Sequence, residues 1–316
     1  MSFSLPFPMH FLSVRDLSRE QFCALLELST DLKRRPSSYS TRLEGRSLGL
    51  VFQKPSTRTR VSFDGGMNQL GGHTLSLLRS DLHLGRGETI GDTVRVMSRY
   101  LDVIAARLYS HTDLEEMATC SSIPVINALT DDLHPCQMLA DFFTLQEEFG
   151  DLESLKLAYV GDGNNVARSL LLAATLLGVS ISIASPSGYQ ISSDYETEAR
   201  ALAQMSGAEI LFTDDPSEAV AESDAVYTDV WASMGQEDSA ARRREDFRGY
   251  CVDADLMTRA KPSAIFLHCL PAHRGEEVSA EVVDGSQSRI FDQAENRLHS
   301  QKALLLLLLG KGEIAG

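Results

Sequence analysis

The sequence is poor in cysteine, in tryptophan and in positive charge. Five cysteines are scattered over 316 residues without metal-type spacing, and there is one tryptophan. An odd number of dispersed cysteines argues against a disulfide framework and against a structural zinc site. The 29 Lys and Arg residues are outnumbered by 44 Asp and Glu residues, which gives a formal net charge of −15. Such a chain has little positive field to attract nucleic acid or an anionic membrane, so we expect a small-molecule ligand.

Long hydrophobic runs are lacking as well. The leucine run at residues 304–309 is far too short to cross a bilayer, and the first residues show no basic segment ahead of an apolar stretch of secretory length. We therefore expect a cytoplasmic protein. A chain of this length that is 43% hydrophobic and 23% charged has the composition of a globular protein with two medium-sized domains.

Strand-like and helix-like segments alternate along the chain. Short apolar strand candidates are residues 47–52, 73–78, 102–107, 123–127, 155–160, 180–185, 208–212, 225–229 and 264–269. Amphipathic helix candidates are residues 18–32, which open with the capping-box pair Ser18 and Gln21, and residues 87–101, 110–120, 134–149 and 293–310. The charged stretch 236–246 is expected to be a solvated surface loop.

This alternation predicts an α/β fold with two doubly wound parallel-sheet domains joined by interdomain helices. We place the first domain at residues 1–150 and the second at residues 151–292. The C-terminal helix has an apolar face, so we expect residues 293–316 to return to the first domain.

The segment FQKPSTRTRVSF, residues 52–63, concentrates arginines and hydroxyl groups in an otherwise acidic chain. A strand candidate ends just before it, and a helix is predicted to begin near Thr57. The free backbone N–H groups of a helix N-terminus, hydroxyl donors and a guanidinium group together favour an anion such as phosphate. A capped helix with surface ion pairs is the alternative, and the motif alone leaves both open.

Further polar residues lie at strand ends and helix starts. Arg107 ends the strand candidate 102–107, and ligands of parallel sheets bind beyond the carboxyl ends of strands. The motif HPCQ puts His134 and Gln137 on one face of a helix start, where they offer a titratable donor and an amide to a common ligand. Arg297 lies in the C-terminal segment AENR. Each of these residues, taken alone, could equally be structural.

The second half of the chain carries its own motifs. Asp229 ends a strand in DVWASMGQ, and Cys269 ends a strand in LHCLP. A strand-end cysteine near cationic groups could be a reactive thiol, although a buried structural thiol is the usual case. GDGNN follows a strand and opens a helix, as a dinucleotide fingerprint does, but Val166 stands at the third glycine position. The next strand also ends in Ser185 and Pro186 instead of an acidic residue, which argues against a nicotinamide-dependent dehydrogenase.

Taken in order, STRTR, HPCQ, GDGNN, DVWASMGQ, HCLP and AENR closely resemble the ornithine carbamoyltransferases of the aspartate/ornithine transcarbamoylase family. STRTR and HPxQ are typical of the whole family, whereas SMG and HCLP indicate its ornithine branch. The resemblance implies transfer of the carbamoyl group of carbamoyl phosphate to the side-chain amine of L-ornithine. The products would be L-citrulline and phosphate in arginine metabolism, and no cofactor or metal ion is expected.

The resemblance also implies the site residues. Carbamoyl phosphate would be bound by Ser56, Thr57, Arg58, Thr59, His83, Arg107, His134, Gln137, Cys269, Leu270 and Arg297. L-Ornithine would be bound by Asn165, Asp229, Ser233 and Met234. Cys269, Arg107 and His134 would take part in catalysis. The resemblance further implies a homotrimer in which the loop with His83 reaches the carbamoyl phosphate site of the neighbouring subunit.

Three other functions remain as rivals at this stage: a transcarbamoylase with another acceptor such as putrescine or N-acetylornithine, a Rossmann-type dehydrogenase, and a non-catalytic ligand-binding relative. The DVWASMG stretch argues against the first, because a site built to pair with charged α-groups penalises a ligand that lacks them. The full polar set argues against the last. An assay for citrulline formation separates them.

Overall fold

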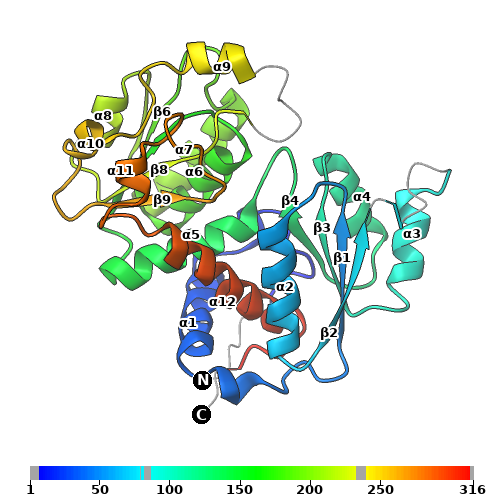
Figure 1. The fold of residues 1–316 in the computed structure, drawn as a ribbon. Coiled ribbons are helices and arrows are strands. Elements are labelled where there is room, and N and C mark those ends of the chain that lie inside the picture. Colours follow the sequence, from blue (N-terminus) through cyan, green and yellow to red (C-terminus); the bar gives the residue numbers. More distant parts are fainter. Residues whose placement is uncertain (1–6, 79, 82–86, 233–239, 314–316) are drawn as a thin grey trace. The chain divides into compact units, whose positions relative to one another are not determined.

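The computed structural model describes residues 7–78, 80–81, 87–232 and 240–313. The chain divides into two compact units (Figure 1). Unit 1 runs up to Phe143 and includes the C-terminal segment from Glu295, and unit 2 is Thr144–Ala294. The unit boundaries fall inside α5 (Pro135–Phe149) and α12 (Ile290–Leu308).

Unit 1 contains a four-stranded sheet whose described strands all run parallel, in the order β2-β1-β3-β4. Its strands are β1 (Ser47–Phe52), β2 (His73–Leu78), β3 (Val103–Arg107) and β4 (Val125–Leu129). Its helices are η1 (Val14–Asp16), α1 (Arg19–Arg34), η2 (Pro36–Tyr39), α2 (Thr57–Gln69), α3 (Ile90–Met97) and α4 (His111–Cys120), with parts of α5 and α12. The apolar strand β1 is buried along its whole length, whereas the edge strand β2 is partly exposed.

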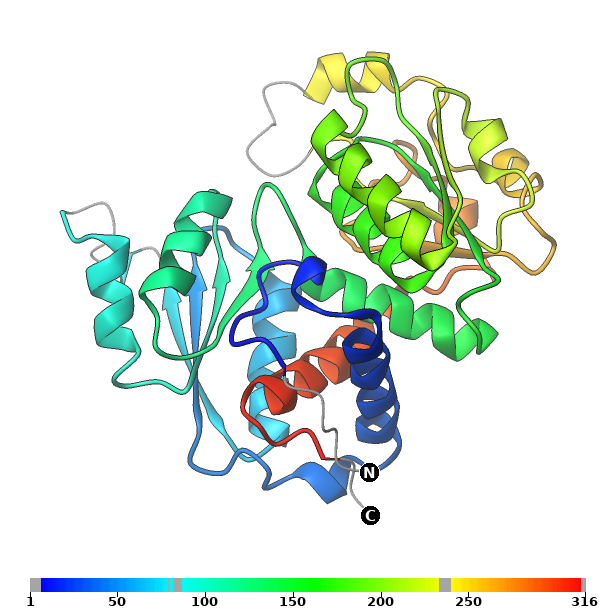
Figure 2. The ribbon, with the colours of Figure 1, turned by 180° about the vertical axis from the view of Figure 1, so that it is seen from behind.

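Helix α1 begins at the predicted capping box. The Ser18 side chain accepts a hydrogen bond from the Gln21 N–H, and the Gln21 side chain accepts one from the Ser18 N–H. The helix buries Phe22, which packs edge-on against Phe142 with ring centroids 5.9 Å apart. Figure 1 and Figure 2 show α12 beside α1 and α2. The leucine run of α12 is thereby buried in unit 1, and no helix in the described residues is long and apolar enough to cross a membrane.

Unit 2 contains a five-stranded sheet, again parallel throughout its described strands, in the order β7-β6-β5-β8-β9. The strands are β5 (Lys156–Val160), β6 (Ser180–Ala184), β7 (Ile210–Thr213), β8 (Ala225–Thr228) and β9 (Ile265–His268). The helices are α6 (Asn165–Leu177), α7 (Ser193–Ser206), α8 (Pro216–Val220), α9 (Ala240–Asp246), α10 (Ala254–Met257) and α11 (Ala280–Val283), with the remainder of α5 and α12.

Both sheets are doubly wound, so the predicted fold class is confirmed. In unit 1 the strand order changes direction between β1 and β3, and in unit 2 it changes direction between β5 and β8. Sheets of this kind bind ligands beyond the carboxyl ends of the strands at such a switch point. Each unit therefore has one position at which a ligand is expected.

The charged stretch 236–246 differs from the sequence-based expectation of a surface loop. Its described part forms α9. The next residue, Phe247, is fully buried and stacks on Trp231 with ring centroids 5.4 Å apart. Arg243 also pairs with Asp162. Because Phe247 directly follows the charged stretch, the composition of that stretch gave no sign of this packing.

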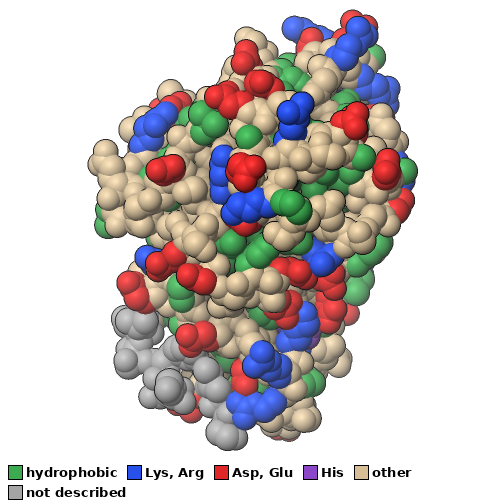
Figure 3. All heavy atoms as spheres, turned by 90° about the vertical axis from the view of Figure 1, so that its left-hand side faces the viewer, with side chains coloured by type: hydrophobic (Ala, Val, Ile, Leu, Met, Phe, Trp, Pro, Cys, Tyr) green, Lys and Arg blue, Asp and Glu red, His purple; other side chains and the backbone are tan. Residues whose placement is uncertain are grey.

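The face of the molecule in Figure 3 carries both positively and negatively charged side chains. On this face Lys and Arg side chains are interspersed with Asp and Glu side chains, and the hydrophobic patches are small. The net negative charge of the chain is thus compatible with local groups of cationic side chains.

Candidate active site

One candidate ligand site, called the first half-site below, lies at the β1–β3 switch point of unit 1, where α2 begins after β1. Ser56 is the N-cap, and its Oγ accepts a hydrogen bond from the Thr59 N–H at 3.2 Å. Thr57 and Arg58 occupy the first positions of the helix and are exposed. The prediction of a helix beginning at Thr57 is confirmed. The backbone N–H groups in the first turn of a helix favour an anion.

Two further arginines of this half-site are buried. Arg107 is the last residue of β3, and its backbone pairs in register with Phe52 at the end of β1. Arg297 on α12 donates one hydrogen bond to the Gln137 Oε1 at 3.0 Å and another to the Thr59 Oγ1 at 3.1 Å. These bonds join the starts of α2 and α5 to α12. The structure therefore brings Thr59, Gln137 and Arg297 together.

His134 precedes α5 and is buried among these cations. Burial holds the pKa of His134 well below its usual value, and the charges of Arg297, Arg107 and Arg58 lower it further. A neutral imidazole offers one N–H donor and one acceptor nitrogen. The shared influence of three guanidinium groups on one imidazole shows that positive potential converges here, which suits a ligand with negative charge.

Sequence reasoning missed two supporting residues in this half-site. Lys54, between β1 and α2, is buried, forms an ion pair with Asp131 after β4, and lies 4.5 Å from the ring centroid of Tyr109. Asp141 accepts a hydrogen bond from the Gln137 Nε2 at 2.8 Å. The only sign in the sequence that Lys54 belongs to this half-site was its position two residues before the STRTR motif.

A separate candidate ligand site, called the second half-site below, lies at the β5–β8 switch point of unit 2. Asn164 is the N-cap of α6: its Oδ1 accepts hydrogen bonds from the Val166 and Ala167 N–H groups at 2.9 and 3.1 Å. Its Nδ2 donates to the Asp229 Oδ2 at 2.8 Å. Asn165, the residue predicted from the resemblance, is the first residue of α6 and is half-buried. Sequence reasoning missed Asn164, although an asparagine just before a helix is a common N-cap.

Cys269 follows β9 and contacts the other oxygen of the same carboxylate. Its Sγ donates a hydrogen bond to the Asp229 Oδ1 at 3.1 Å. The Cys269 side chain thus lies beside the Asp229 carboxylate. Asp229 is thus fixed through both oxygens.

The segment after Cys269 is held by a buried histidine. Leu270 has a left-handed backbone (φ 60°), and its N–H donates to the His268 Nδ1 at 2.9 Å. Because this nitrogen accepts, the ring proton lies on Nε2 and is donated to the Glu277 Oε1 at 3.1 Å. Both His268 and Glu277 are fully buried.

Two other cysteines are poor nucleophiles. Burial raises the pKa of the Cys136 thiol to about 12. Burial, together with the nearby Asp253 and Glu277 carboxylates, raises that of Cys251 to about 11. Both thiols remain protonated at neutral pH.

Two groups of side chains could be taken for metal sites. The ligand atoms of Asp229, His268 and Cys269 lie within 4.8 Å of one another, as do those of His273, Glu276 and Glu277. In the first group Cys269 is hydrogen-bonded to the Asp229 carboxylate, and in the second the His273 N–H donates to the Glu277 Oε1 at 2.6 Å. Contacts within the protein therefore account for the closeness of both groups.

Three predicted site residues, His83, Ser233 and Met234, lie outside the described residues. The other predicted residues divide between the two units: Ser56, Thr57, Arg58, Thr59, Arg107, His134, Gln137 and Arg297 belong to unit 1, and Asn165, Asp229, Cys269 and Leu270 belong to unit 2.

Comparison with known proteins identifies both units. The model of the carbamoyl-P binding domain of aspartate/ornithine carbamoyltransferase matches residues 9–147, and that of the Asp/Orn binding domain matches residues 153–308. The ornithine carbamoyltransferase of Caldicellulosiruptor saccharolyticus is 53% identical over 301 residues, which are 95% of this chain and 98% of the relative. That of Bacillus subtilis is 51% identical over 302 residues, 96% of this chain and 94% of the relative.

Solved structures agree. The ornithine carbamoyltransferase from Pyrococcus furiosus is 48% identical, covers 97% of this chain and 99% of its own, and has a TM-score of 0.94. The anabolic ornithine carbamoyltransferase from Campylobacter jejuni is 41% identical, with coverages of 95% and 99% and a TM-score of 0.91. The chain therefore belongs to the aspartate/ornithine carbamoyltransferase family.

Proposed function

We propose that the protein transfers the carbamoyl group of carbamoyl phosphate to the side-chain amine of L-ornithine, giving L-citrulline and phosphate. The observation that carries this proposal is the chemistry of the two half-sites within one family of transferases. The first has guanidinium groups converging at a helix N-terminus, and the second has a carboxylate fixed beside a thiol. The names of the relatives with about half of their residues identical point to the same reaction.

The first half-site suits carbamoyl phosphate. The phosphate would be bound by the first turn of α2 and by Arg58, whose guanidinium can donate two parallel hydrogen bonds. Arg107, His134 and Thr59 would donate to the carbamoyl oxygen. The proposed residues of unit 1 are Ser56, Thr57, Arg58, Thr59, Arg107, His134, Gln137 and Arg297. Cys269 and Leu270 of unit 2 and His83 from a neighbouring subunit complete the proposed carbamoyl phosphate set.

The reaction explains why donors are needed at the carbonyl. Attack of the neutral amine nitrogen forms a C–N bond and places negative charge on the carbamoyl oxygen. The C–O bond to phosphate then breaks, phosphate leaves with the electron pair, and the proton that the attacking nitrogen loses passes to the phosphate. Donors that are already in place for this charge stabilise the transition state. His134 fits such a role in its neutral form, because its lowered pKa keeps it uncharged and one ring N–H can still donate.

The second half-site suits a zwitterionic amino acid with a further amine. Asp229 would pair with the α-amino group, and Asn165, Ser233 and Met234 would bind the α-carboxylate. The side-chain amine must lose a proton before it attacks, so deprotonation is expected to limit the rate at low pH. We propose that Cys269 orients this amine without forming a covalent carbamoyl-thioester.

The assembly and cellular setting are part of this proposal. By resemblance to the family, the protein would be a homotrimer with shared active sites, would act in the cytoplasm in arginine metabolism, and would need no cofactor.

A comparison of acceptors tests the proposed function. Purified protein with carbamoyl phosphate is assayed with L-ornithine, putrescine, N-acetylornithine and L-aspartate, and each carbamoylated product is quantified by mass spectrometry. We expect product from ornithine alone at an appreciable rate. A higher kcat/KM for putrescine or N-acetylornithine would contradict the assignment of Asp229 to an α-amino group, and no product with any acceptor would contradict the enzyme function itself.

A further inference from the structure

Arg243 differs from the arginines beside it on α9. Its side chain is 14% exposed, whereas those of Arg242 and Arg244 are 84% and 58% exposed. One nitrogen, Nη1, donates to the Asp162 Oδ2 at 2.6 Å and to the Trp231 carbonyl oxygen at 2.5 Å. The guanidinium also lies 4.9 Å from the ring centroid of Tyr189. Arg243 therefore joins α9 to the segments that follow β5, β8 and β6.

These contacts link Arg243 to the two segments that carry the second half-site. Asp162 lies two residues before Asn164, and Trp231 lies two residues after Asp229. Asn164 and Asp229 are themselves hydrogen-bonded at 2.8 Å. Arg243 thus connects the two backbone segments that carry this pair. These segments follow β5 and β8, the strands that form the switch point of the sheet.

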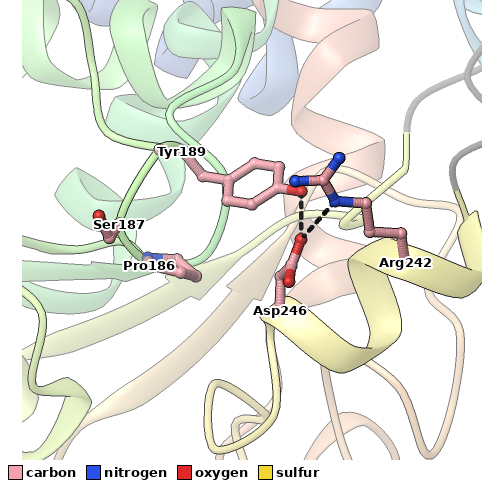
Figure 4. A pocket seen from close by; sticks show the side chains of 6 residues that line it. Pro186, Ser187, Tyr189, Arg242 and Asp246 are labelled. Atoms are coloured by element: carbon pink, nitrogen blue, oxygen red, sulfur yellow. Dashed lines mark hydrogen bonds and ion pairs between the residues drawn. The ribbon is translucent and has the colours of Figure 1, made fainter.

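Helix α9, which carries Arg243, is fixed by contacts of its last residue, Asp246, and of the next residue, Phe247. The Tyr189 hydroxyl donates to the Asp246 Oδ2 at 2.7 Å, as Figure 4 shows. Phe247 packs edge-on against Tyr189 with ring centroids 4.8 Å apart, and it also stacks on Trp231. An arginine on a fixed helix can hold the loops that it touches.

Charge gives Arg243 a second effect. Burial raises the pKa of the Asp162 carboxyl, the nearby Asp229 raises it further, and Arg243 opposes both influences. A guanidinium placed beside two neighbouring carboxylates offsets their mutual repulsion. Removing it would push the Asp162 segment away from Asp229 or leave Asp162 protonated.

We infer that Arg243 is a positioning residue for the amino-acid substrate: through Asp162 and the Trp231 carbonyl it fixes the orientation in which Asp229 receives the α-amino group. The inference rests on the proposed function, because it takes ornithine as the ligand of Asp229. Arg243 touches no substrate itself. Its loss should therefore act on ornithine and leave carbamoyl phosphate unaffected.

Steady-state kinetics of three variants test this role. Arg243→Gln removes the charge, Arg243→Lys keeps an ammonium whose three donors can serve both oxygens, and Arg248→Gln changes an 83% exposed arginine just beyond α9. We expect Arg243→Gln to raise the KM for ornithine by about tenfold or more, with the KM for carbamoyl phosphate unchanged within about twofold. Arg243→Lys should restore most of the affinity, and Arg248→Gln should equal the wild type.

Two kinetic outcomes would overturn the inference. One is a similar rise in both KM values, which is what a general loss of structure would cause. The other is an Arg243→Gln variant that behaves like Arg248→Gln. If Arg243→Gln does not fold, Asp162→Asn, which keeps the shape of the side chain, replaces it: a raised KM for ornithine supports the inference, and an unchanged one rejects it.

A second measurement needs no substrate. Trp231 is the single tryptophan of the chain, so its fluorescence reports on the acceptor of the Arg243 bond. We expect acrylamide to quench Trp231 more strongly in Arg243→Gln than in the wild type, Arg243→Lys or Arg248→Gln. If the wild type makes no citrulline, the proposed function fails while this result can still hold. Stronger quenching with an unchanged KM for ornithine would reject the positioning role.

Discussion

The arginines of the first half-site differ in burial, so their removal should affect the stability of the fold to different degrees. Arg107 and Arg297 are buried, and Arg297 bonds across two helices, whereas Arg58 is exposed at the start of α2. Loss of a buried, hydrogen-bonded cation leaves its partners unsatisfied and destabilises the fold. Arg58 is therefore the residue whose removal should separate binding from stability.

We expect Arg58→Ala to weaken carbamoyl phosphate binding while the protein remains folded. Loss of a charged partner for a phosphate dianion costs about 2–5 kcal/mol, or about 30-fold or more in affinity. Calorimetric titration gives the affinity, and thermal unfolding gives the stability. Arg60→Ala, an exposed arginine of the same helix, is the matched control and should bind normally. Near-normal affinity in folded Arg58→Ala would refute the role proposed for the α2 N-terminus.

Asp229→Asn should act on the other substrate. The carboxylate accepts from Asn164 and from Cys269, and an amide in its place keeps one acceptor oxygen and loses the charge that would pair with an α-amino group. We expect ornithine binding to weaken by about tenfold or more and carbamoyl phosphate binding to stay close to normal. Titration with each substrate measures both. The opposite pattern would mean that the two substrates have been assigned to the wrong halves.

At this scale the sequence could predict residue types but not their partners. Arg297 contacts Gln137 and Thr59 from 160 and 238 positions away, and no spacing rule relates residues so far apart. The resemblance to a family supplied those residues. It pointed to Asn165, whereas the side chain that holds Asp229 belongs to Asn164, because which of two adjacent asparagines is the N-cap depends on where the helix begins.

At the scale of elements, the sequence predicted the strands better than the helix ends. Strand candidates 47–52 and 73–78 coincide with β1 and β2: the first is a short apolar run that is fully buried, and the second alternates polar residues with leucines, as a partly exposed edge strand does. The helix candidate 87–101 is shorter in the structure: α3 begins after its N-cap Thr89 and ends at Met97. Helix α9 was not predicted, because it is stabilised by tertiary contacts: Arg243 pairs with Asp162, and Phe247, directly after the helix, stacks on Trp231.

The glycine of the β5–α6 turn is required by close packing of two segments. A Cβ on Gly163 would lie 2.5 Å from the Ile191 nitrogen and 2.8 Å from the Tyr189 carbonyl oxygen, and the Gly163 N–H donates to that same oxygen at 2.7 Å. Backbone atoms cannot rotate away as a side chain can. The motif that resembles a dinucleotide fingerprint thus packs against the β6–α7 segment.

We expect Gly163→Ala to destabilise unit 2 by about 1–3 kcal/mol, because the added methyl group overpacks the turn. It should also raise the KM for ornithine, since Asn164 is the next residue. Gly65→Ala is the control: a Cβ there lies 4.0 Å from its nearest neighbour, within helix α2, so the change should be neutral or stabilising by up to about 1 kcal/mol. Urea unfolding measures both. Equal stability of the two variants would refute the packing argument.

At the scale of the whole molecule, a net charge of −15 coexists with a cationic site because the two are separated by depth and position. Buried arginines and a lysine surround the first half-site, while acidic side chains are spread over the surface seen in Figure 3. Surface charge is screened within about 10 Å at ordinary ionic strength. The acidic surface therefore leaves the attraction of the site for a dianion largely intact.

The last prediction concerns the proposed trimer, in which His83 of one subunit would serve the site that contains Arg58 of its neighbour. His83→Ala and Arg58→Ala proteins are unfolded, mixed in equal amounts and refolded. In a closed ring of three, any hybrid has one place where a chain with intact Arg58 meets a neighbour with intact His83. Every hybrid then has one complete site of three, and random mixing should restore about a quarter of wild-type activity.

The controls of this experiment decide between sharing and independence. Each parent refolded alone should stay inactive, and native mass spectrometry should show both hybrid compositions. If His83 serves only its own chain, each site of a hybrid lacks one residue or the other, and mixing adds nothing. The shared site would therefore be rejected if confirmed hybrids recover no activity although the His83→Ala parent is strongly impaired. That outcome would leave Arg58 and the first turn of α2 in their proposed role of binding phosphate.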